Sequence, residues 1–281
     1  MNIIKCPVCG KKSEKKDKTY ICVNNHSFDI AKQGYTNFLL NNDKKSKEPG
    51  DTKEMLLARK NFLDKGYYKF ILEQVKNTII TDITDAQNKS VNLNVIDVGC
   101  GEGYYLSGMI NDIDEAVKNT GAHYYGVDIS KEGIRLAALR NENVEWFVAN
   151  SFNLPFVDNC FDYVISMFSI LDTKECSRVL KENGKIIFVT AQREHLKELK
   201  EIIYPVLTEK KYEAENLQGC NIVKSTDFTS KVMIDSNYDL WNLLSMTPHF
   251  WKAEEKNKLL LNDHDRLEVT ININIKVLKS T

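Results

Sequence analysis

The stretch VIDVGCGEGYY (residues 95–105) joins a short apolar run to a glycine-rich turn, and helical sequence follows it. Glycine allows a ligand to approach the backbone, and the N–H groups at a helix N-terminus are unpaired donors. The pattern Gly99-x-Gly101-x-Gly103 departs from the dinucleotide fingerprint, because its third glycine comes one residue early. By itself the stretch indicates either a ligand-binding turn or a plain tight turn.

Similar strand-like and helix-like segments alternate after this turn. Apolar runs predict five strands, at 94–99, 123–130, 144–150, 161–169 and 185–191. Helical spacing predicts helices between them, at 104–120, 131–142 and 173–184. Such repeats indicate an α/β fold with a mostly parallel, Rossmann-like sheet covered by helices on both faces. Residues 266–280 alternate apolar and polar, which predicts a half-exposed antiparallel strand at the end of the sheet.

Polar residues follow successive strands of this predicted sheet. Asp97 lies within the first strand, Asp128 and Ile129 end the second, and Asn150 and Ser151 end the third. A carboxylate at Asp128 can accept both hydroxyls of a ribose, and the amide can reach an adenine edge. With the glycine turn, these strand ends predict a nucleoside site at the carboxyl edge of the sheet. The sequence lacks a phosphate-binding GKS/T, so the ligand carries something other than phosphates.

A second group of chemically distinctive residues lies near the N-terminus, in CPVCGKKSEKKDKTYICVNNH (6–26). The ligand pattern is Cys6-x2-Cys9-x12-Cys22-x3-His26. Four sulfur and nitrogen ligands without a carboxylate favour a closed, structural Zn²⁺ site over a catalytic one. The three cysteines and one histidine could also be unrelated polar residues, but their finger-like spacing argues against that. Cys100, Cys160, Cys176 and Cys220 are expected to be small buried hydrophobic residues.

Composition limits the class of protein. The chain has 281 residues, of which 42% are hydrophobic and 27% charged, as is usual for globular proteins. No apolar run approaches the roughly 20 residues that cross a bilayer, and the first residues lack a signal-peptide pattern. We therefore expect a cytoplasmic protein with reduced thiols and no membrane partner.

Charge and local pattern suggest how the chain is divided. Residues 1–70 hold 15 Lys/Arg against 8 Asp/Glu, whereas residues 71–281 hold 23 against 31. A basic front suggests a polyanionic partner, although a solvated lysine-rich surface would look the same. Helical spacing in 51–79, interrupted at Gly66, predicts two helices, the first capped by Asp51 or Thr52.

These motifs resemble those of a known family. DVGCGEGYY, GVDIS and the LPF after the third strand resemble class I S-adenosylmethionine-dependent methyltransferases. CPVCG…YICVNNHSFDIAKQGYTNFLL, KEPGDTKEMLLARKNFLDKGYY and SMTPHFWKA are similar to bacterial 23S ribosomal RNA guanine-N1 methyltransferases. The similarity covers almost the whole chain. It implies a zinc-binding domain at 1–36, a linker and helical connection at 37–70 and a methyltransferase domain at 71–281.

The resemblance also implies individual residues. Cys6, Cys9, Cys22 and His26 match the family's metal ligands. Gly101, Glu102, Tyr68 and His195 match its cofactor contacts; without the resemblance, Tyr68 would be a core aromatic and His195 a surface histidine. The complete predicted cofactor set is Tyr68, Asp97, Gly99, Gly101, Glu102, Gly103, Asp128, Ile129, Asn150, Ser151 and His195.

The sequence departs from the family after the fourth strand. Relatives have an aromatic-Ala-Pro turn there, whereas this chain has Phe168, Ser169 and Ile170, which puts the target nucleotide in doubt. No catalytic residue is assigned. Asp172 is a candidate acceptor for the guanine N1 proton, but a helix cap is the better interpretation of that residue.

The implied activity is methyl transfer to N1 of a guanine in a hairpin of 23S rRNA. The zinc module and the linker would hold the RNA with Lys11, Lys12, Lys15, Lys16, Lys18, Lys44, Lys45 and Lys47. Two alternatives remain: a methyltransferase acting on a small molecule or protein, and a non-catalytic zinc-ribbon protein that only senses a nucleoside. Relatives also allow a homodimer.

Overall fold

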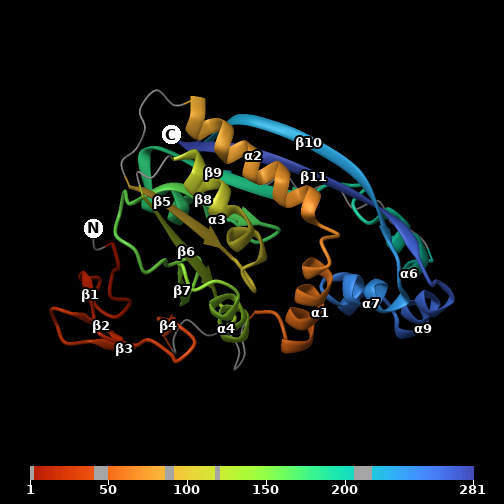
Figure 1. Cartoon of the computed structure of the whole chain (residues 1–281), viewed down its shortest axis with the longest axis horizontal. Helices are drawn as coiled ribbons and strands as arrows, with labels where there is room; N and C mark the ends of the chain where they lie inside the picture. Colours follow the sequence, from red (N-terminus) through yellow and green to blue (C-terminus); the bar gives the residue numbers. More distant parts are fainter. Residues whose placement is uncertain (1–2, 41–49, 86–91, 118–120, 206–216) are drawn as a thin grey trace.

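A mixed sheet of eight strands organises the chain (Figure 1). The computed structural model describes residues 3–40, 50–85, 92–117, 121–205 and 217–281. The strand order is β10-β11-β9-β8-β5-β6-β7-β4. From β9 to β4 every neighbouring pair is parallel, and the β9–β11 and β11–β10 pairs are antiparallel. The bounds are β4 Tyr35–Asn37, β5 Leu93–Val98, β6 Ala122–Asp128, β7 Val144–Val148, β8 Phe161–Met167, β9 Leu180–Ala191, β10 Cys220–Ile234 and β11 Leu267–Ser280. The predicted α/β, mostly parallel, Rossmann-like fold is therefore confirmed.

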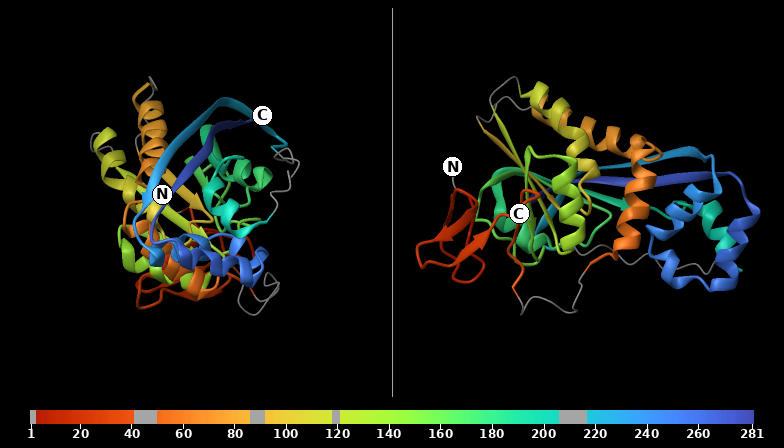
Figure 2. Two further views of the ribbon diagram at one scale, coloured as in Figure 1. Left: turned by 90° about the vertical axis from the view of Figure 1, so that its right-hand side faces the viewer. Right: turned by 60° about the horizontal axis from the view of Figure 1, so that its bottom comes forward.

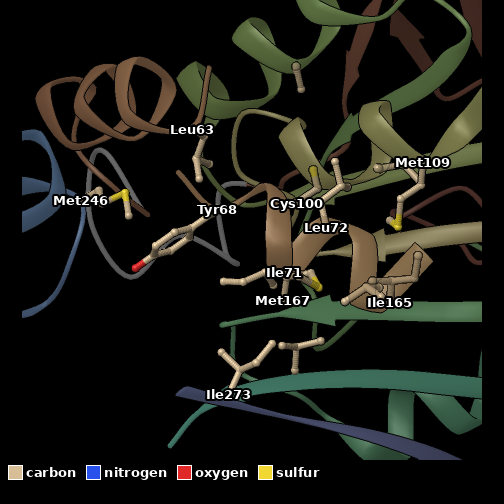
Figure 3. Close-up of a cluster of buried hydrophobic side chains, with 14 of the residues drawn as sticks. Leu63, Tyr68, Ile71, Leu72, Cys100, Met109, Ile165, Met167, Met246 and Ile273 are labelled. Carbon is tan, nitrogen blue, oxygen red and sulfur yellow. The ribbon is translucent and has the colours of Figure 1, made fainter. Parts of the chain in front are cut away.

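Both faces of the sheet are buried, so the apolar residues of its central strand β5 point to both sides. Val95 of β5 faces one hydrophobic cluster, and Ile96 and Val98 face the other. Helices α2 and α3 cover the first face, where Ile71 and Leu72 pack near Met109 (Figure 3). The helices are α1 Lys53–Asp64, α2 Lys69–Asp85, α3 Tyr104–Ala116, α4 Lys131–Arg140, α5 Thr173–Val179, α6 Lys197–Ile203, α7 Asn237–Ser245, α8 His249–Lys252 and α9 Glu255–Lys258, followed by the 3₁₀ turn η2 Leu259–Asp263.

The first two helices follow the prediction. The Thr52 hydroxyl accepts a hydrogen bond from the Met55 N–H at 3.3 Å, so Thr52 rather than Asp51 caps α1. Gly66 has a φ of 81° and separates α1 from α2. A residue with a side chain would be strained in this left-handed conformation, so the glycine turns the chain at low cost.

Two predictions near the end of the sheet were wrong. The helix predicted at 173–184 ends at Val179, because Leu180 already pairs with Phe161 in the β9–β8 ladder. The C-terminal strand is antiparallel but lies inside the sheet, since β10 pairs with its outer side and forms the edge. β11 is consequently mostly buried rather than half-exposed, and the alternating exposure belongs to β10.

The N-terminal module is joined closely to the sheet. Its strands β1 Ser13–Lys16, β2 Thr19–Cys22 and β3 Ser27–Asp29 form a small antiparallel sheet. Tyr20 and Phe38 pack against Phe147 of β7, and the Tyr20 hydroxyl donates a hydrogen bond to Glu145. The next strand, β4, pairs with β7 and spans the domain boundary predicted at residue 36. The module therefore shares a hydrophobic cluster with the sheet.

The two ends of the molecule are built from different elements. The N-terminal module lies at one end of the long axis (Figure 2). At the other end lie α6 and the connection from β10 to β11, which contains α7, α8 and α9. No helix in the described part of the chain is long and apolar enough to cross a membrane.

Candidate functional site

The four predicted metal ligands lie together in the N-terminal module. The ligand atoms of Cys6, Cys9, Cys22 and His26 are all within 4.8 Å of one another. Cys9 Sγ lies 3.7 Å from Cys22 Sγ, and His26 Nδ1 lies 3.6 Å from Cys6 Sγ and 3.5 Å from Cys22 Sγ. Tetrahedral Zn²⁺ with ordinary bond lengths requires edges of about 3.8 Å between sulfurs and about 3.6 Å between sulfur and nitrogen. The donor set and its spacing thus fit a closed structural zinc site.

Two tight turns hold these ligands. The Gly10 N–H donates to the Cys6 carbonyl at 2.9 Å, and the Asn25 N–H donates to the Cys22 carbonyl at the same distance. Gly10 and Asn25 both have positive φ, which the residues of such turns require. The Lys11 N–H lowers the pKa of Cys9 to about 6, which favours the thiolate that binds metal.

The predicted cofactor residues meet in a second place. A cavity of about 860 Å³ lies at the carboxyl ends of β5, β6 and β7, and every predicted cofactor residue except Gly103 lines it. Gly103 packs away from the cavity: a Cβ there would lie 2.8 Å from Trp146 and 2.9 Å from Ala137 Cβ. Gly103 thus allows α3 to approach α4 and β7, and it does not line the cavity.

The other two glycines of the turn border the cavity. A Cβ at Gly99 would lie 2.4 Å from Ser169 Oγ, and one at Gly101 would lie 3.1 Å from the Arg59 guanidinium. Both have positive φ, 79° and 55°. The turn is therefore crowded by side chains from two other segments, and only glycine fits there.

Asp128 is held by the glycine turn. One of its oxygens accepts the Gly101 N–H at 2.9 Å, and the other accepts the Ser130 N–H at 2.7 Å. Burial raises its pKa, and these two backbone donors oppose that shift. Each carboxylate oxygen keeps acceptor capacity, so Asp128 suits two ribose hydroxyls.

Asp97 lies at the bottom of the same cavity. It is 1% exposed, and its Oδ1 has no hydrogen-bond partner among the described residues. Burial, with the nearby charges of Asp128 and Glu102, raises the pKa of Asp97 to about 8. A buried acceptor without a partner is costly, and a ligand that supplies a donor would remove that cost.

Glu102 is engaged by the protein itself. Its carboxylate lies 2.6 Å from the Arg140 guanidinium, which also binds Asp64 of α1 at 2.7 Å. Burial raises the pKa of Glu102, and Arg140 lowers it. Glu102 borders the cavity, but its ion pair also connects the glycine turn to α4.

Tyr68 and His195 contact each other in the cavity wall. Tyr68 Oη lies 3.3 Å from His195 Nε2, and Phe168 lies over the histidine ring with a centroid separation of 6.0 Å. Burial lowers the pKa of His195 to about 4, so its imidazole is neutral at pH 7. Because the Asn272 N–H donates to Nδ1 at 3.2 Å, the proton of the neutral ring lies on Nε2. His195 is thus a half-buried donor in the cavity wall rather than a surface histidine.

Several lining residues were not predicted. Asp51 and Arg59 form an ion pair at 2.6 Å beside the glycine turn, and Met246 and His249 close another side. The stretches that resemble the family, KEPGDTKEMLLARKNFLDKGYY and SMTPHFWKA, contain all four residues and were the available signal. Sequence spacing could not show that two segments so far apart line the same cavity.

The turn after β8 is also informative. Phe168 has a left-handed φ of 54°, and Ser169 Oγ donates to the Val98 carbonyl at 3.0 Å. Asp172 accepts the Glu175 N–H at 3.1 Å and caps α5, and it does not line the cavity. The helix-cap interpretation of Asp172 is therefore confirmed, and its carboxylate is not part of the cavity lining.

Comparisons with known proteins match both parts of the chain. A family model described as "RlmA, N-terminal" matches residues 4–47, and one described as "Methyltransferase domain" matches residues 89–254. A Bacillus subtilis protein provisionally named a 23S rRNA (guanine-N1-)-methyltransferase is 28% identical over 98% of this chain and 96% of its own. The 23S rRNA (guanine(748)-N1)-methyltransferase of Streptomyces fradiae is 30% identical over 70% of this chain and 66% of its own. A Micromonospora griseorubida protein, provisionally named a 23S rRNA (guanine-N1-)-methyltransferase, is 30% identical over 70% of this chain and 68% of its own.

Proposed function

Because this chain belongs to the family of S-adenosylmethionine-dependent 23S rRNA (guanine-N1)-methyltransferases, we propose that it methylates N1 of one guanine in a hairpin of 23S rRNA. The observation that carries the proposal is the cavity at the carboxyl ends of β5, β6 and β7, in a chain that also holds the Cys₃His cluster. A methyltransferase for a small molecule would leave the zinc module and its lysines without a role.

The cavity residues match the parts of S-adenosylmethionine. We assign Asp128 to the ribose hydroxyls, and Asn150 and Ser151 to the adenine. Asp97 Oδ1 would accept from the ammonium group, and the donors of Tyr68 and His195 would suit the carboxylate. When bound, this cofactor supplies a methyl group on a positively charged sulfur, which is already activated for displacement.

The protein's own contribution is orientation. Holding two reactants in line can supply about 7–11 kcal/mol of the barrier. Guanine N1 lies inside a base pair, so the base must leave its partner at a cost of a few kcal/mol. Exposed apolar side chains border the cavity and could receive an unpaired base: Phe152, Phe168 and Ile170.

The N-terminal module offers the RNA a basic surface. Lys11, Lys12, Lys15, Lys16 and Lys18 are all exposed, whereas Lys44, Lys45 and Lys47 lie outside the described residues. Phosphate contacts supply affinity that does not depend on sequence and decreases with salt. The proposal also includes the division of the chain into a zinc-binding domain (1–36), a connection (37–70) and a methyltransferase domain (71–281). It further includes a homodimer of this chain and a cytoplasmic location.

Primer extension tests the proposed function. After incubation of 23S rRNA with the enzyme and S-adenosylmethionine, we expect a reverse-transcriptase stop at one guanine, because N1 methylation blocks pairing. Incorporation of labelled methyl without a stop would indicate another atom of the RNA. Transfer to small molecules or proteins but not to RNA would contradict the proposal, and an absence of transfer to any substrate would favour a nucleoside sensor.

A further inference from the structure

The amino-acid part of S-adenosylmethionine carries a carboxylate and an ammonium group, so its binding site must offer charges of both signs. This reasoning rests on the proposed function, because it takes that cofactor as the ligand of the cavity. Carboxylates that line the cavity are those of Asp51, Asp97, Glu102 and Asp128. A ligand carboxylate placed among them without a cation beside it would be buried at a high cost in free energy.

Tyr68 and His195 do not supply that cation. Burial lowers the pKa of His195 to about 4, so its ring is neutral at pH 7. Tyr68 is neutral as well, because burial raises the pKa of its hydroxyl. Among the residues that the structure describes, Arg59 is the one lysine or arginine that lines the cavity. A guanidinium stays charged over the whole pH range in which proteins fold.

The guanidinium of Arg59 lies between three segments of the cavity wall. Its Nη2 forms an ion pair with Asp51 at 2.6 Å and lies 3.5 Å from the Met246 carbonyl oxygen. A Cβ at Gly101 would lie 3.1 Å from Nη1, so this nitrogen lies beside the glycine turn. Within the described part of the chain, Nη1 donates no hydrogen bond. One end of the guanidinium is therefore held by the protein, and the other end is available to a ligand.

The surroundings of Nη1 favour a ligand with both charges of an amino acid. The 13-residue helix α3 starts directly after the glycine turn, and no described side chain caps its N-terminus at Gly103. The unpaired N–H groups and the dipole of such a helix give a partial positive charge there. In the same cavity, Asp97 Oδ1 is buried and has no partner among the described residues. The cavity thus offers a positive region for a carboxylate and an unpaired acceptor for an ammonium group.

Tyr105 connects Arg59 with the neutral donors Tyr68 and His195. Burial raises the pKa of Tyr105, Tyr68 adds to that shift, and the charge of Arg59 opposes it, so both residues lie near Tyr105. The ring of Phe168 lies 6.4 Å from that of Tyr105 and 6.0 Å from that of His195, between centroids. The guanidinium and the two neutral donors therefore belong to one region of the cavity.

We propose that Arg59 supplies the positive charge that pairs with the carboxylate of S-adenosylmethionine, and that Asp51 orients the guanidinium by holding Nη2. Tyr68 and His195 complete this part of the site with neutral donors. Arg59 then determines specificity for the amino-acid part of the cofactor. A ligand that lacks the carboxylate leaves Nη1 without a partner and is bound less tightly.

Isothermal titration calorimetry of the zinc-loaded full chain tests this pairing without RNA and without reaction. The two probes are S-adenosylmethionine and decarboxylated S-adenosylmethionine, which differ only by the carboxylate. We expect Arg59→Gln to raise the Kd for S-adenosylmethionine by about 10-fold or more, because an ion pair inside a cavity is lost. The Kd for the decarboxylated ligand should rise by less than about threefold. Lys53→Gln removes the same charge from an exposed position of α1 outside the cavity, and it should match wild type for both ligands.

Equal losses for the two ligands in Arg59→Gln overturn the proposal, because Arg59 would then support the cavity without contacting the carboxylate. An unchanged Kd for S-adenosylmethionine overturns it as well. If circular dichroism shows that Arg59→Gln does not fold, Arg59→Lys decides, since it keeps the charge but not the planar fork. In Arg59→Lys we expect a larger loss for S-adenosylmethionine than for the decarboxylated ligand, and equal losses again reject the proposal.

The outcomes separate this inference from the proposed function. Equal losses for both ligands in Arg59→Gln, while wild type gives the primer-extension stop, reject the role of Arg59 and keep the proposed function. A loss confined to S-adenosylmethionine in Arg59→Gln, while wild type gives no stop, rejects the guanine-N1 product and keeps the role of Arg59.

Discussion

The N-terminal module and the cavity at the sheet edge are built in opposite ways. The module has four ligand side chains at short sequence spacing, strands of three or four residues, and exposed lysines around them. The cavity draws its walls from segments between residues 50 and 249 and buries its titratable groups. A bound metal can hold the structure of the module within a short segment of chain, whereas the cavity forms only when the complete sheet has folded.

The largest expected effect comes from removing the metal. In Cys22→Ser, or after chelation, we expect the module to lose its structure, because structural zinc in small domains contributes about 10–16 kcal/mol of apparent binding free energy. Since Phe38 and Tyr20 pack against Phe147, the melting temperature of the whole chain should fall too. Differential scanning calorimetry with parallel zinc analysis measures both effects. An unchanged melting temperature in a zinc-free protein would mean that the module does not stabilise the sheet. Cys220→Ser, outside the cluster, is the matched control.

A smaller effect is expected from the cavity, through Asp97. Its pKa is about 8 in the folded protein and about 4 in an unfolded chain, so the folded state holds an extra proton between these values. Stability from this group is present below pH 4 and is lost as pH rises toward 8, by at most a few kcal/mol. Asp97→Asn should remove this part of the slope, as measured by urea denaturation at pH 5, 6, 7 and 8. A wild-type slope that persists in Asp97→Asn would assign it to other groups.

The smallest effect on stability is expected from the lysines of the module. Lys15→Gln with Lys16→Gln should change the free energy of unfolding by less than about 0.5 kcal/mol, because both side chains are exposed. RNA affinity should fall, and the slope of log K against log salt should decrease by roughly one to two if both contact phosphate. Filter binding to an rRNA hairpin at several salt concentrations provides the slope. The pair Lys276→Gln with Lys279→Gln, on β11, serves as control, and an equal decrease there would place the RNA elsewhere.

The sequence predicted those features that depend on local chemistry. The glycine turn, Asp128 and the four metal ligands lie where spacing and strand ends placed them. β10 was missed because it is an edge strand whose middle, residues 224–231, contains one apolar residue, Phe228, among Lys, Ser, Thr and Asp. Gly103 was assigned to the ligand because a turn glycine facing a helix and one facing a ligand have the same local sequence.

Tertiary contacts decided the remaining features. The left-handed Phe168 depends on the Ser169 hydrogen bond to Val98 and on its own N–H, which donates to the Val189 carbonyl. His195 is a half-buried donor rather than an ordinary surface histidine because the Asn272 N–H of β11 donates to its Nδ1. These partners, Val98, Val189 and Asn272, are all far in sequence from the residues that they contact. Local spacing in the sequence therefore does not predict the contacts.

The pairing of β4 with β7 also fixes the distance between the N-terminal module and the cavity. The strand that leaves the metal module is hydrogen-bonded to the strand whose end carries Asn150 and Ser151, so the span from the lysines to the cavity is set by the sheet itself. If the lysines of the module bind RNA phosphates, the nucleotide that enters the cavity would be selected by its distance from those phosphates as well as by its base. Exchanging modules between relatives should preserve that distance only if the exchanged piece includes β4.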